Sequence, residues 1–595
     1  MSISSSPADG AAKRSYDFEG EFASYPYTEL NAIYQHAFAD NFSLPALTDY
    51  VSGRTMTYGE LGRRIARLHL FYELAGIRPG DKIALLGKNT PSWVVVFMGT
   101  ITYGAVIVPV LQEFNPVDTV NILNHSDAVL LFASDVNIAT LPYDGPEDLP
   151  QIRAIVSLDS RKVVKEHPGS YPCADRYVKN HFQLMSRLQP RFRRRYPHGF
   201  RPEDIRYKSY PGDAVAVINY TSGTTGFSKG VMLSNDNLRG NVVFGIRSRL
   251  HYQGSRALSF LPLAHAYGCA FDMLVPLSVG THVTLLGKMP TPQVLLKAFA
   301  EVRPSLIICV PLILEKIYRK MIVPMLTKNP IRWVLALPLL DKAVYARVRA
   351  RLVEAFGGEF EEVIVGGAPL NPEVEEFLHR IHFPFTVGYG MTECGPLISY
   401  TPWRRFVPGS SGRTLKGIME ARVTEDSTLP PFNGMPQGEI TVRGLNVMKG
   451  YYKNPDATEA VLTEDGWLHT GDMGAVGDPY GRTIYIRGRY KTMILSANGQ
   501  NIYPEEIEAK LSNMPFVAEC LVVDRGGRLV ALVYPDQEPV RHHRLSPEAL
   551  TAAMENNRTE VNKLVAPYER IEAIELQPEE FAKTPKRSIK RFLYS

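Results

Sequence analysis

Cysteine is scarce in this sequence, and charge of neither sign dominates it. The 595 residues contain five cysteines, far apart along the chain: Cys173, Cys269, Cys309, Cys394 and Cys520. This odd and scattered set argues against a disulfide framework and against a structural zinc site, and it is typical of a reducing compartment. The formal net charge of +5 is compatible with anionic ligands or an anionic membrane surface but requires neither.

The N-terminus lacks the apolar core of a signal peptide, so we expect a disordered tail at residues 1–20. One uncharged stretch, residues 93–111, approaches the length of a membrane span. Glycine and proline interrupt it, and its second half is β-branched. It therefore predicts a buried helix from about Ser92, a turn near Gly104 and a buried parallel strand. We expect no transmembrane segment and a cytoplasmic protein.

Length and periodicity indicate a large α/β protein. A chain of 595 residues exceeds what one hydrophobic core usually supports. Apolar runs typical of strands alternate with helical patterns, as parallel sheets covered by helices require. The expected strands are 82–86, 128–132, 154–158, 257–261, 282–286 and 305–309, and the expected helices are 58–74 and 292–302.

The pattern changes after about residue 438, where short strands and Gly-rich turns begin. A further unit of about a hundred residues starts near Tyr503, which is the size of a small domain. Its expected elements are a helix at 504–511 and strands at 518–523 and 529–534. We expect a tail at 1–20, a large domain at 21–488, a hinge at 489–491 and a small α+β domain at 492–595.

The most informative segment is a loop rich in glycine and hydroxyl groups. Residues 220–231 read Tyr-Thr-Ser-Gly-Thr-Thr-Gly-Phe-Ser-Lys-Gly-Val and follow an apolar run that predicts a buried strand. Such a loop turns backbone N–H groups toward one point, and hydroxyls with a lysine suit a polyphosphate. It is not a Walker A loop, because Gly230 follows Lys229 where a Mg²⁺-binding Ser or Thr should stand. Taken alone, the loop is equally compatible with a solvated turn.

The loop resembles the phosphate loop of adenylate-forming enzymes, the superfamily of acyl-CoA synthetases, luciferases and peptide-synthetase adenylation domains. The resemblance continues from about residue 27 to the C-terminus. It implies that superfamily's fold, a large α/β domain of parallel and mixed sheets covered by helices, with a β-subdomain, followed by a small mobile α+β domain. It also implies that ATP is contacted by Thr221, Ser222, Gly223, Thr224, Thr225, Gly226 and Lys229.

Two further segments are similar to parts of the superfamily's site. Residues 260–268, Phe-Leu-Pro-Leu-Ala-His-Ala-Tyr-Gly, resemble the segment that lines the acyl site. Residues 366–369, Gly-Gly-Ala-Pro, resemble the turn beneath the adenine, where glycine lets the backbone approach a flat ring. Either segment alone would suggest only a packed histidine or an ordinary turn. The resemblance implies acyl-side roles for His265, Tyr267 and Gly268 and nucleotide contacts from Gly367, Ala368 and Pro369.

Residues 388–395, Gly-Tyr-Gly-Met-Thr-Glu-Cys-Gly, resemble the segment whose threonine meets the α-phosphate and whose glutamate holds Mg²⁺. This resemblance implies catalytic roles for Thr392 and Glu393, with Thr221 as a second protein ligand of the metal. Magnesium prefers oxygen ligands, usually one or two carboxylates plus phosphates, so this set is chemically reasonable. The same segment implies nucleotide contacts from Gly388, Tyr389, Gly390 and Met391.

The ribose site and the hinge also have counterparts. Trp-Leu-His-Thr-Gly-Asp, which ends at Asp472, resembles the segment whose aspartate accepts from both ribose hydroxyls. Arg-Gly-Arg-Tyr-Lys, which ends at Lys491, matches the hinge. It implies that Arg489 reaches the ribose and that backbone rotation at Lys491 swings the small domain. The loop at 496–508, represented by Gly499, matches the one that faces the pantetheine of CoA.

The C-terminal tail departs from the pattern. Relatives carry a lysine that contacts the reacting carboxylate and the α-phosphate, and the alignment puts Ser588 at that position. A neutral hydroxyl does not supply this charge, whose loss can cost about two to three orders of magnitude in rate. In an extended tail, Lys586 and Lys590 share a face with Ser588, whereas Arg587 would reach the site if the tail turns.

The resemblance implies that a carboxylic acid is activated with Mg·ATP and then transferred to CoA. Residues 316–358 and 231–238 resemble bacterial long-chain fatty acyl-CoA synthetases, so we expect a long-chain fatty acid–CoA ligase that uses ATP, Mg²⁺ and CoA. Two alternatives stay open. One is an acyl-AMP ligase that loads an acyl carrier protein, and the other is a weakly catalytic nucleotide- or lipid-binding relative, motivated by Ser588.

Two segments are strongly basic. Arginines crowd into residues 187–195, and basic residues mix with an apolar run in residues 321–352. Such a surface attracts anionic lipid headgroups, although a solvated basic face is equally compatible with the pattern. No nucleic-acid-binding motif accompanies the charge, so we expect no nucleic-acid partner. The oligomeric state stays open, a homodimer included.

Overall fold

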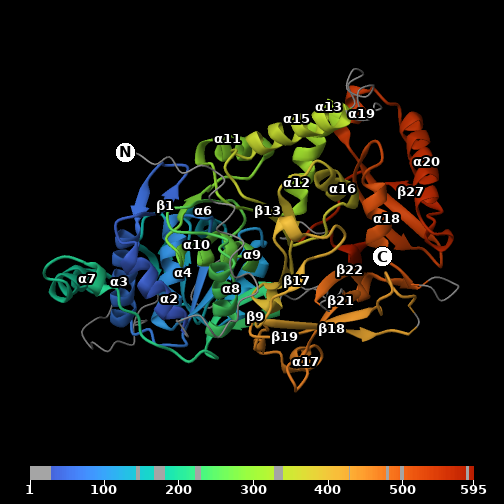
Figure 1. The fold of residues 1–595 in the computed structure, drawn as a ribbon. Helices are drawn as coiled ribbons and strands as arrows, with labels where there is room; N and C mark the ends of the chain where they lie inside the picture. The colour runs from blue at the N-terminus through green and yellow to red at the C-terminus, as the bar shows by residue number, and fades with distance from the viewer. Residues whose placement is uncertain are drawn as a thin grey trace.

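The computed structural model describes most of the chain. The described residues are 29–142, 148–166, 181–221, 229–326, 340–427, 429–477, 482–495, 501–584 and 589–594. Figure 1 shows a large body, blue to yellow, and a smaller unit in red that lies against one end of it. The tail expected at 1–20 lies outside the described residues.

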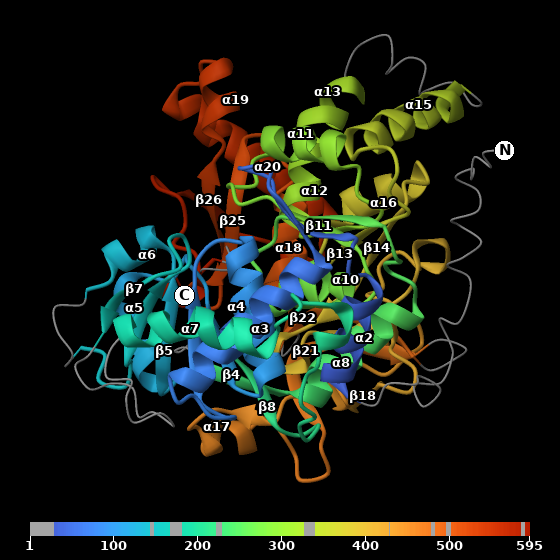
Figure 2. The same cartoon turned by 90° about the vertical axis from the view of Figure 1, so that its left-hand side faces the viewer.

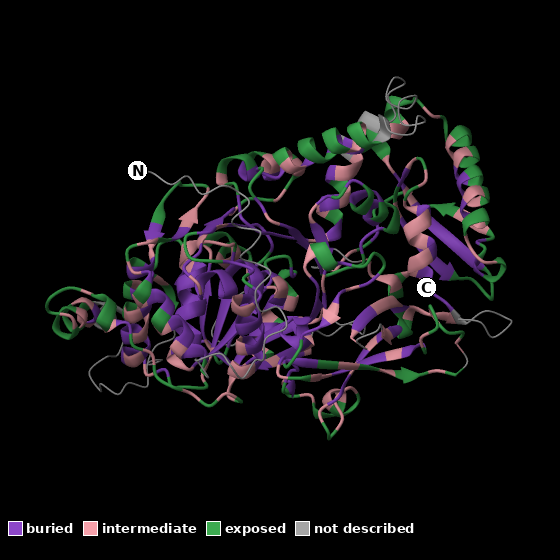
Figure 3. Cartoon of the chain, in the orientation of Figure 1, coloured by how far each residue is buried: buried purple, intermediate pink, exposed green. Residues whose placement is uncertain are grey.

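The largest sheet has eight strands and carries the expected phosphate loop at a strand end. Its central strands run parallel in the order β8-β4-β3-β5-β6, and β7, β9 and β20 pair antiparallel at the edges. These strands are largely buried (purple in Figure 3), which explains their continuous apolar runs. Their bounds are β3 Lys82–Leu86, β4 Val106–Val110, β5 Ala128–Ala133, β6 Ala154–Ser157, β7 Val163–Glu166, β8 Val215–Thr221, β9 Lys229–Ser234 and β20 Gly450–Tyr451.

Helices lie against this sheet and against one another. Figure 2 shows α3 beside α4 and α7 on the side that faces the viewer. Thr57 and Glu60 form a capping box at the start of α3, which fixes where that helix begins. The helices of this part are α2 Leu30–Asp40, α3 Tyr58–Leu74, α4 Pro91–Tyr103, α5 Pro116–His125, α6 Asp135–Thr140, α7 His181–Arg195 and α8 Asn235–Arg247.

Three more sheets complete the large domain. One has the order β10-β11-β1-β2, a second is the parallel β12-β13-β14, and the third is the antiparallel β15-β16-β17-β22-β21-β19-β18. Their strands are β1 Pro45–Asp49, β2 Thr55–Thr57, β10 Arg256–Ser259, β11 His282–Leu285, β12 Ile307–Cys309, β13 Val363–Val365, β14 Phe385–Val387, β15 Tyr389–Gly390, β16 Leu397–Tyr400, β17 Arg413–Thr414, β18 Met419–Glu425, β19 Gly438–Gly444, β21 Leu468–Gly477 and β22 Thr483–Arg489. The α/β class expected from the sequence is confirmed.

The remaining helices of the large domain connect these sheets. They are α9 Ala266–Cys269, α10 Val275–Leu277, α11 Pro292–Val302, α12 Pro311–Ile317, α13 Val323–Leu326, α15 Leu340–Ala355, α16 Pro372–Arg380 and α17 Pro455–Glu459. A π-helical turn at Ala270–Leu274 joins α9 to α10. The strands expected in this region and before it, from 82–86 to 305–309, end within two residues of the observed bounds.

The long uncharged stretch is a buried helix and strand, as predicted. Thr90 caps α4 by accepting from the Trp93 amide, and Gly104 ends the helix in the left-handed region at φ 86°. The chain then enters β4, whose residues are all buried. Within the described part of the chain, no helix has both the length and the apolar character needed to cross a membrane.

The small domain has a hydrophobic core of its own. Its helices and strands are η7 Tyr490–Thr492, β23 Ile494–Leu495, β24 Asn501–Ile502, α18 Pro504–Leu511, β25 Val517–Asp524, β26 Leu529–Pro535, α19 Gln537–His542, α20 Pro547–Leu564 and β27 Ala573–Leu576. Ile507, Leu511, Val533 and Val561 are among the residues of a buried cluster distinct from the core of the large domain. The exact bounds expected for the domains and the hinge at 489–491 stay predictions.

Candidate active site

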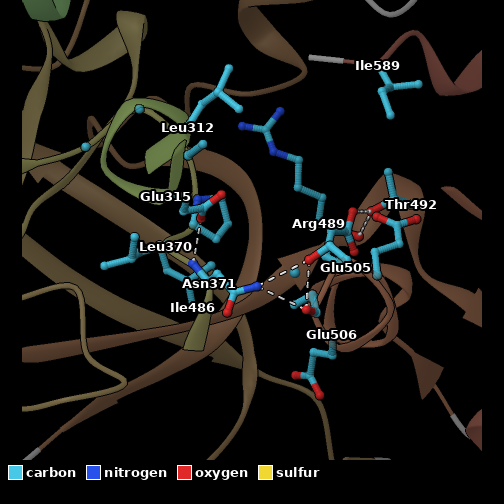
Figure 4. A pocket seen from close by; sticks show the side chains of 18 of the residues that line it. Leu312, Glu315, Leu370, Asn371, Ile486, Arg489, Thr492, Glu505, Glu506 and Ile589 are labelled. Atoms are coloured by element: carbon cyan, nitrogen blue, oxygen red, sulfur yellow. Dashed lines mark hydrogen bonds between the residues drawn. The ribbon is translucent and has the colours of Figure 1, made fainter. Parts of the chain in front are cut away.

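A cleft of about 3620 Å³ is lined by residues of both domains. Figure 4 shows part of it, with Leu312 and Asn371 of the large domain facing Glu505 and Ile589 of the small domain. Most predicted site residues in the described ranges line this cleft. They are Thr221, Lys229, His265, Tyr267, Gly367, Ala368, Pro369, Gly388, Tyr389, Gly390, Met391, Thr392, Glu393, Asp472, Arg489, Lys491 and Lys590.

The two ends of the phosphate loop are held side by side. Thr221 ends β8 and Lys229 begins β9, and the two residues pair in the antiparallel register. The two strands are therefore paired up to both ends of the loop, and Thr221 and Lys229 both line the cleft. The loop residues Ser222, Gly223, Thr224, Thr225 and Gly226 lie outside the described residues, so their roles stay predictions.

Tyr451 connects the predicted metal carboxylate to the phosphate-loop lysine. Its hydroxyl donates to Glu393 Oε1 at 2.9 Å, and Lys229 Nζ lies 4.7 Å from the centroid of its ring. Burial raises the pKa of the Tyr451 phenol, and the negative charge of Glu393 raises it further. The phenol therefore stays protonated and donates to the carboxylate.

The predicted ribose aspartate is fixed from two sides. Tyr389 donates to Asp472 Oδ2 at 2.6 Å, and Arg489 Nε donates to Oδ1 at 3.0 Å. Asp472 is only 4% exposed, and this burial raises the pKa of its carboxyl although Arg489 opposes the shift. Asp472 in turn is the main cause of the raised pKa of Arg489. Three segments that resemble motifs of the superfamily, those of Tyr389, Asp472 and Arg489, thus meet at the Asp472 carboxylate.

The Gly-Gly-Ala-Pro turn lies close to an aromatic ring. A Cβ on Gly366 would come within 3.1 Å of the Tyr267 ring, and Gly367 has φ of 86°. Tyr267 donates to the Ile364 carbonyl at 3.1 Å, which fixes the ring beneath the turn. Glycine is therefore favoured at 366 by the close approach of the ring and at 367 by the backbone conformation.

The acyl side of the cleft is mainly apolar. Phe244, Leu250, Phe271, Ile308 and Ile364 line it. His265 caps the short helix α9, where its Nδ1 accepts from the Tyr267 amide at 3.4 Å. Gly268 does not line the cleft, because its Cα faces the Pro262 carbonyl, 2.6 Å from where a Cβ would stand. Its assignment to the acyl side stays a prediction.

Polar contacts between the domains fix the present orientation of the small domain. Arg487 Nε lies 2.7 Å from Glu506 Oε1, and Arg319 Nη2 donates to the Ser512 carbonyl at 2.9 Å. Asn371 Nδ2 lies within hydrogen-bond distance of the Ala509 carbonyl, 3.1 Å away, and of side-chain oxygens at the end of α18. Lys491 lies in η7, and its role as a hinge stays a prediction.

Two residues of the C-terminal tail pair with each other. Lys583 and Ile589 form an antiparallel bridge, and residues 585–588 lie outside the described residues. Lys590 follows the bridge and lines the cleft, which makes it a described cation that can act there. Gly499, Lys586, Arg587 and Ser588 lie outside the described residues, so the replacement of the expected lysine stays a prediction from the sequence.

Sequence reasoning missed Tyr451 and Asn371. Nothing next to Tyr451 in the sequence ties it to Glu393, because β20 reaches the site by joining the far edge of the large sheet. Asn371 does carry a recognisable helix-capping signal, since it precedes Pro372 and accepts from the amides of Glu373 and Val374. That signal does not reveal its second set of contacts with the small domain.

The donor set fits magnesium. Glu393 and Thr221 line the same cleft and offer a carboxylate and a hydroxyl, and Tyr451 orients the carboxylate. Oxygen ligands of this kind suit a hard cation that completes its shell with water and phosphate. The described residues contain no group of three or more His, Cys, Asp or Glu side chains arranged to bind a metal. A magnesium site that is completed by water and phosphate does not need such a group of side chains.

Comparison with known proteins connects the site to a family. Residues 35–452 match the model of the AMP-binding enzyme family, and residues 491–594 match that of the AMP-binding enzyme C-terminal domain. A peroxisomal protein of Arabidopsis thaliana, long chain acyl-CoA synthetase 6, is 30% identical over 509 residues, which are 82% of this chain and 69% of the relative. A feruloyl-CoA synthase of an Amycolatopsis species is 30% identical over 475 residues, or 79% of this chain and 81% of the relative.

Solved structures share the fold over nearly the whole chain. ATP-bound MatB from Rhodopseudomonas palustris superposes with a TM-score of 0.70 at 22% sequence identity, covering 95% of this chain and 98% of MatB. The expected arrangement of a large domain followed by a small C-terminal domain is therefore confirmed.

Proposed function

Since this chain belongs to the AMP-binding enzyme family and is an AMP-forming acid–CoA ligase, we propose that its acid is a long-chain fatty acid. The products would be acyl-CoA, AMP and pyrophosphate. The single observation that carries the proposal is that one cleft joins the residues predicted to bind ribose and phosphate to an apolar wall. That wall includes Phe244, Leu250, Phe271 and Ile308. The names of relatives support the proposal, although one of them acts on an aromatic acid.

In the first step, a carboxylate oxygen of the acid attacks the α-phosphorus of ATP. The bond from that phosphorus to pyrophosphate breaks, and an acyl-adenylate forms. Asp472 would hold the ribose hydroxyls, Thr392 would donate to the α-phosphate, and Lys229 would lie by the phosphates. A Mg²⁺ ion held by Glu393 and Thr221 supplies charge neutralisation when bound. These groups would act by positioning the reactants and by stabilising charge, which together account for most of the catalysis of phosphoryl and adenylyl transfer.

In the second step, the sulfur of CoA attacks the acyl carbon. The thioester bond forms, AMP leaves with the electron pair of the broken bond, and the thiol proton passes to solvent. We propose that the small domain rotates about Lys491 between the steps, because the predicted hinge lies between the domains. The contacts that α18 makes with the large domain are polar, so they can break and be replaced by others when the domain rotates. Lys590 would supply the tail cation in the first step.

The test is release of AMP and pyrophosphate from Mg·ATP, with and without CoA, across acids from acetate to oleate and with ferulate. We expect CoA-dependent AMP release that is fastest with the long acids. Preference for ferulate or for short acids would overturn the chain-length proposal while leaving the ligase activity in place. Pyrophosphate release that proceeds with long acids but ignores CoA would overturn the proposed acceptor.

We further propose that the enzyme meets its lipid substrate at an anionic membrane surface. The arginine face, defined by Arg63, Arg64, Arg67, Arg161, Arg191, Arg193 and Arg194, covers α3, α7 and the β6–β7 turn. Arg67 donates to Gln189 of α7 at 2.5 Å, so these elements are in contact.

The arginines of this face repel one another. Burial lowers the pKa of Arg64 and Arg67, and the charges of Arg161 and Arg63 lower it further. Figure 1 shows α7 projecting from the body, where a flat surface can reach it. Concentrated positive charge on a projecting helix favours anionic headgroups.

A further inference from the structure

A third chain segment joins the two segments that are predicted to face the phosphates. Residues 448–452 contain β20, which pairs with β9 in the register Tyr451 to Val231. Lys449 N donates to the Met232 carbonyl at 2.9 Å, and Tyr452 N donates to the Gly230 carbonyl at 2.7 Å. Met448 N donates to the Glu393 carbonyl at 2.8 Å. One short segment therefore bonds to the strand that leaves the phosphate loop and to the backbone of the metal carboxylate.

The side chain of Tyr451 also connects the two segments, because it contacts a charged group of each. Its hydroxyl bonds to Glu393 Oε1, and its ring faces the ammonium of Lys229 at 4.7 Å. Tyr451 is 8% exposed, so both interactions are largely shielded from water. A hydrogen bond to a charged group and a desolvated cation–π contact are each stronger than their exposed equivalents. The carboxylate and the ammonium each contact this one aromatic side chain, and no ion pair between the two occurs among the described residues.

We propose that Tyr451 is a positioning residue that keeps the Glu393 carboxylate free of Lys229 and aimed at the metal of Mg·ATP, an inference that rests on the proposed function. Without the phenol, Glu393 can turn toward the nearby ammonium, and each group then loses its position for the phosphates. Tyr451 would touch neither substrate nor metal. Its role would appear in the magnesium dependence of nucleotide binding and not in binding of AMP, which needs no metal.

The neighbouring residue provides a matched control. Tyr452 lies on the other side of the same segment and donates to Asp127 Oδ2 at 2.7 Å. Tyr452→Phe removes one phenolic hydrogen bond from the same five-residue stretch without touching Glu393. Tyr451→Phe removes the bond to Glu393 but keeps the ring over Lys229, whereas Tyr451→Leu removes both interactions. The three variants separate the hydroxyl, the ring and general loss of structure.

The experiment is calorimetric titration of the full-length protein with ATP across Mg²⁺ concentrations and in EDTA, with AMP as a second ligand and no acid present. We expect Tyr451→Phe to weaken ATP binding about three- to tenfold with Mg²⁺, as loss of the typical net contribution of one hydrogen bond predicts, and to leave AMP binding unchanged. Tyr451→Leu should also weaken ATP binding in EDTA. Tyr452→Phe should match the wild type under all conditions.

Two results would overturn the inference alone. They are wild-type magnesium dependence in Tyr451→Phe, or equal losses in Tyr451→Phe and Tyr452→Phe while the wild type binds Mg·ATP normally. A double mutant with Glu393→Gln adds a further check, because the effect of Tyr451→Phe should vanish when the carboxylate is gone. Failure of the wild type to bind Mg·ATP at all would instead overturn the proposed function, and this inference with it.

Discussion

The side-chain amides of Asn371 and Asn513 bond to each other in both directions across the domain boundary. Asn371 Nδ2 donates to Asn513 Oδ1 at 2.9 Å, and Asn513 Nδ2 donates to Asn371 Oδ1 at 3.1 Å. Figure 4 shows Asn371 at the wall of the cleft that faces the small domain. Because a rotation of the small domain would separate the two residues, the pair belongs to one orientation of the enzyme.

Asn371→Asp tests this assignment. An aspartate keeps the oxygen that caps α16 but loses the donor to Ala509 and Asn513. We expect the half-reaction that uses this orientation to slow about thirtyfold, because the two lost hydrogen bonds between the domains contribute about 1 kcal/mol each. Pyrophosphate exchange measures the first half-reaction, and transfer from purified acyl-adenylate to CoA measures the second. Asn513→Ala should act in the same direction, and an equal change in both half-reactions would contradict the interpretation.

Asp472→Asn should weaken binding of AMP by about tenfold or more. The substitution removes the charge that faces Arg489 and halves the capacity to accept from the ribose. Tyr389→Phe is the matched control, because it removes only the 2.6 Å bond that holds Asp472 and leaves the carboxylate in place. We expect a smaller loss from that variant in an AMP titration. Equal affinity of Asp472→Asn and the wild type would contradict the ribose assignment.

Lys590→Ala should slow formation of the acyl-adenylate by about two to three orders of magnitude, if Lys590 replaces the lysine missing at Ser588. Transfer from isolated acyl-adenylate to CoA should stay at the wild-type rate. Adding Ser588→Lys to Lys590→Ala should restore the first step, and this rescue separates a missing charge from damage to the tail. A wild-type rate in Lys590→Ala alone would show that the cation comes from elsewhere.

Charge reversal at Arg191, Arg193 and Arg194 should reduce sedimentation with anionic vesicles. Each basic residue near such a surface contributes about 1 kcal/mol, so a hundredfold loss or more is expected in low salt. The matched control reverses Arg347, Arg349 and Arg351, which are exposed on the other basic helix, α15. The measurement compares phosphatidylglycerol with phosphatidylcholine vesicles at two salt concentrations. Loss of binding only in the control would assign the contact to α15.

Glu508 should make the small domain less stable as pH rises toward neutrality. It bonds to Arg591 and accepts from the Val522 amide at 2.6 Å, and burial raises its pKa to about 7. Because the folded state binds this proton more tightly, the contribution to stability is complete below about pH 4.5 and is lost as pH rises through about 7.

Glu508→Gln should remove this pH dependence. The difference in local unfolding free energy between variant and wild type should change by up to about 3 kcal/mol over that interval. Hydrogen exchange of β25 amides, corrected for the intrinsic rate at each pH, provides the measurement. Parallel pH profiles for the two proteins would contradict the assignment to Glu508.

The sequence predicted the fold where local signals were strong. The strand at 82–86 and the helix at 58–74 have their expected bounds, because a continuous apolar run and a capping box each act within a few residues. The stretch at 93–111 could also be resolved into helix and strand, since Gly104 can adopt the backbone conformation that ends α4.

The sequence indicated residues that line one cleft, but not the contacts among them. Motifs pointed to Glu393 and Asp472 because each stands within a distinctive local sequence, and their roles stay predictions. They could not reveal that Tyr451 bonds to Glu393, since those residues meet only after distant strands have joined the sheets. The contact between Asn371 and the end of α18 could not be predicted for the same reason. It also forms in only one orientation of the small domain.

The position of β20 has a consequence for synthesis on the ribosome. This strand forms the edge of the eight-stranded sheet and pairs with β9, yet it is translated more than two hundred residues after β9. At ordinary elongation rates β9 therefore waits on the order of ten to forty seconds for its partner. During that interval a nascent chain exposes unpaired backbone groups next to the phosphate loop, which invite pairing with another chain. The late arrival of Gly450 and Tyr451 thus makes this edge the place where we expect chaperones to protect the emerging enzyme.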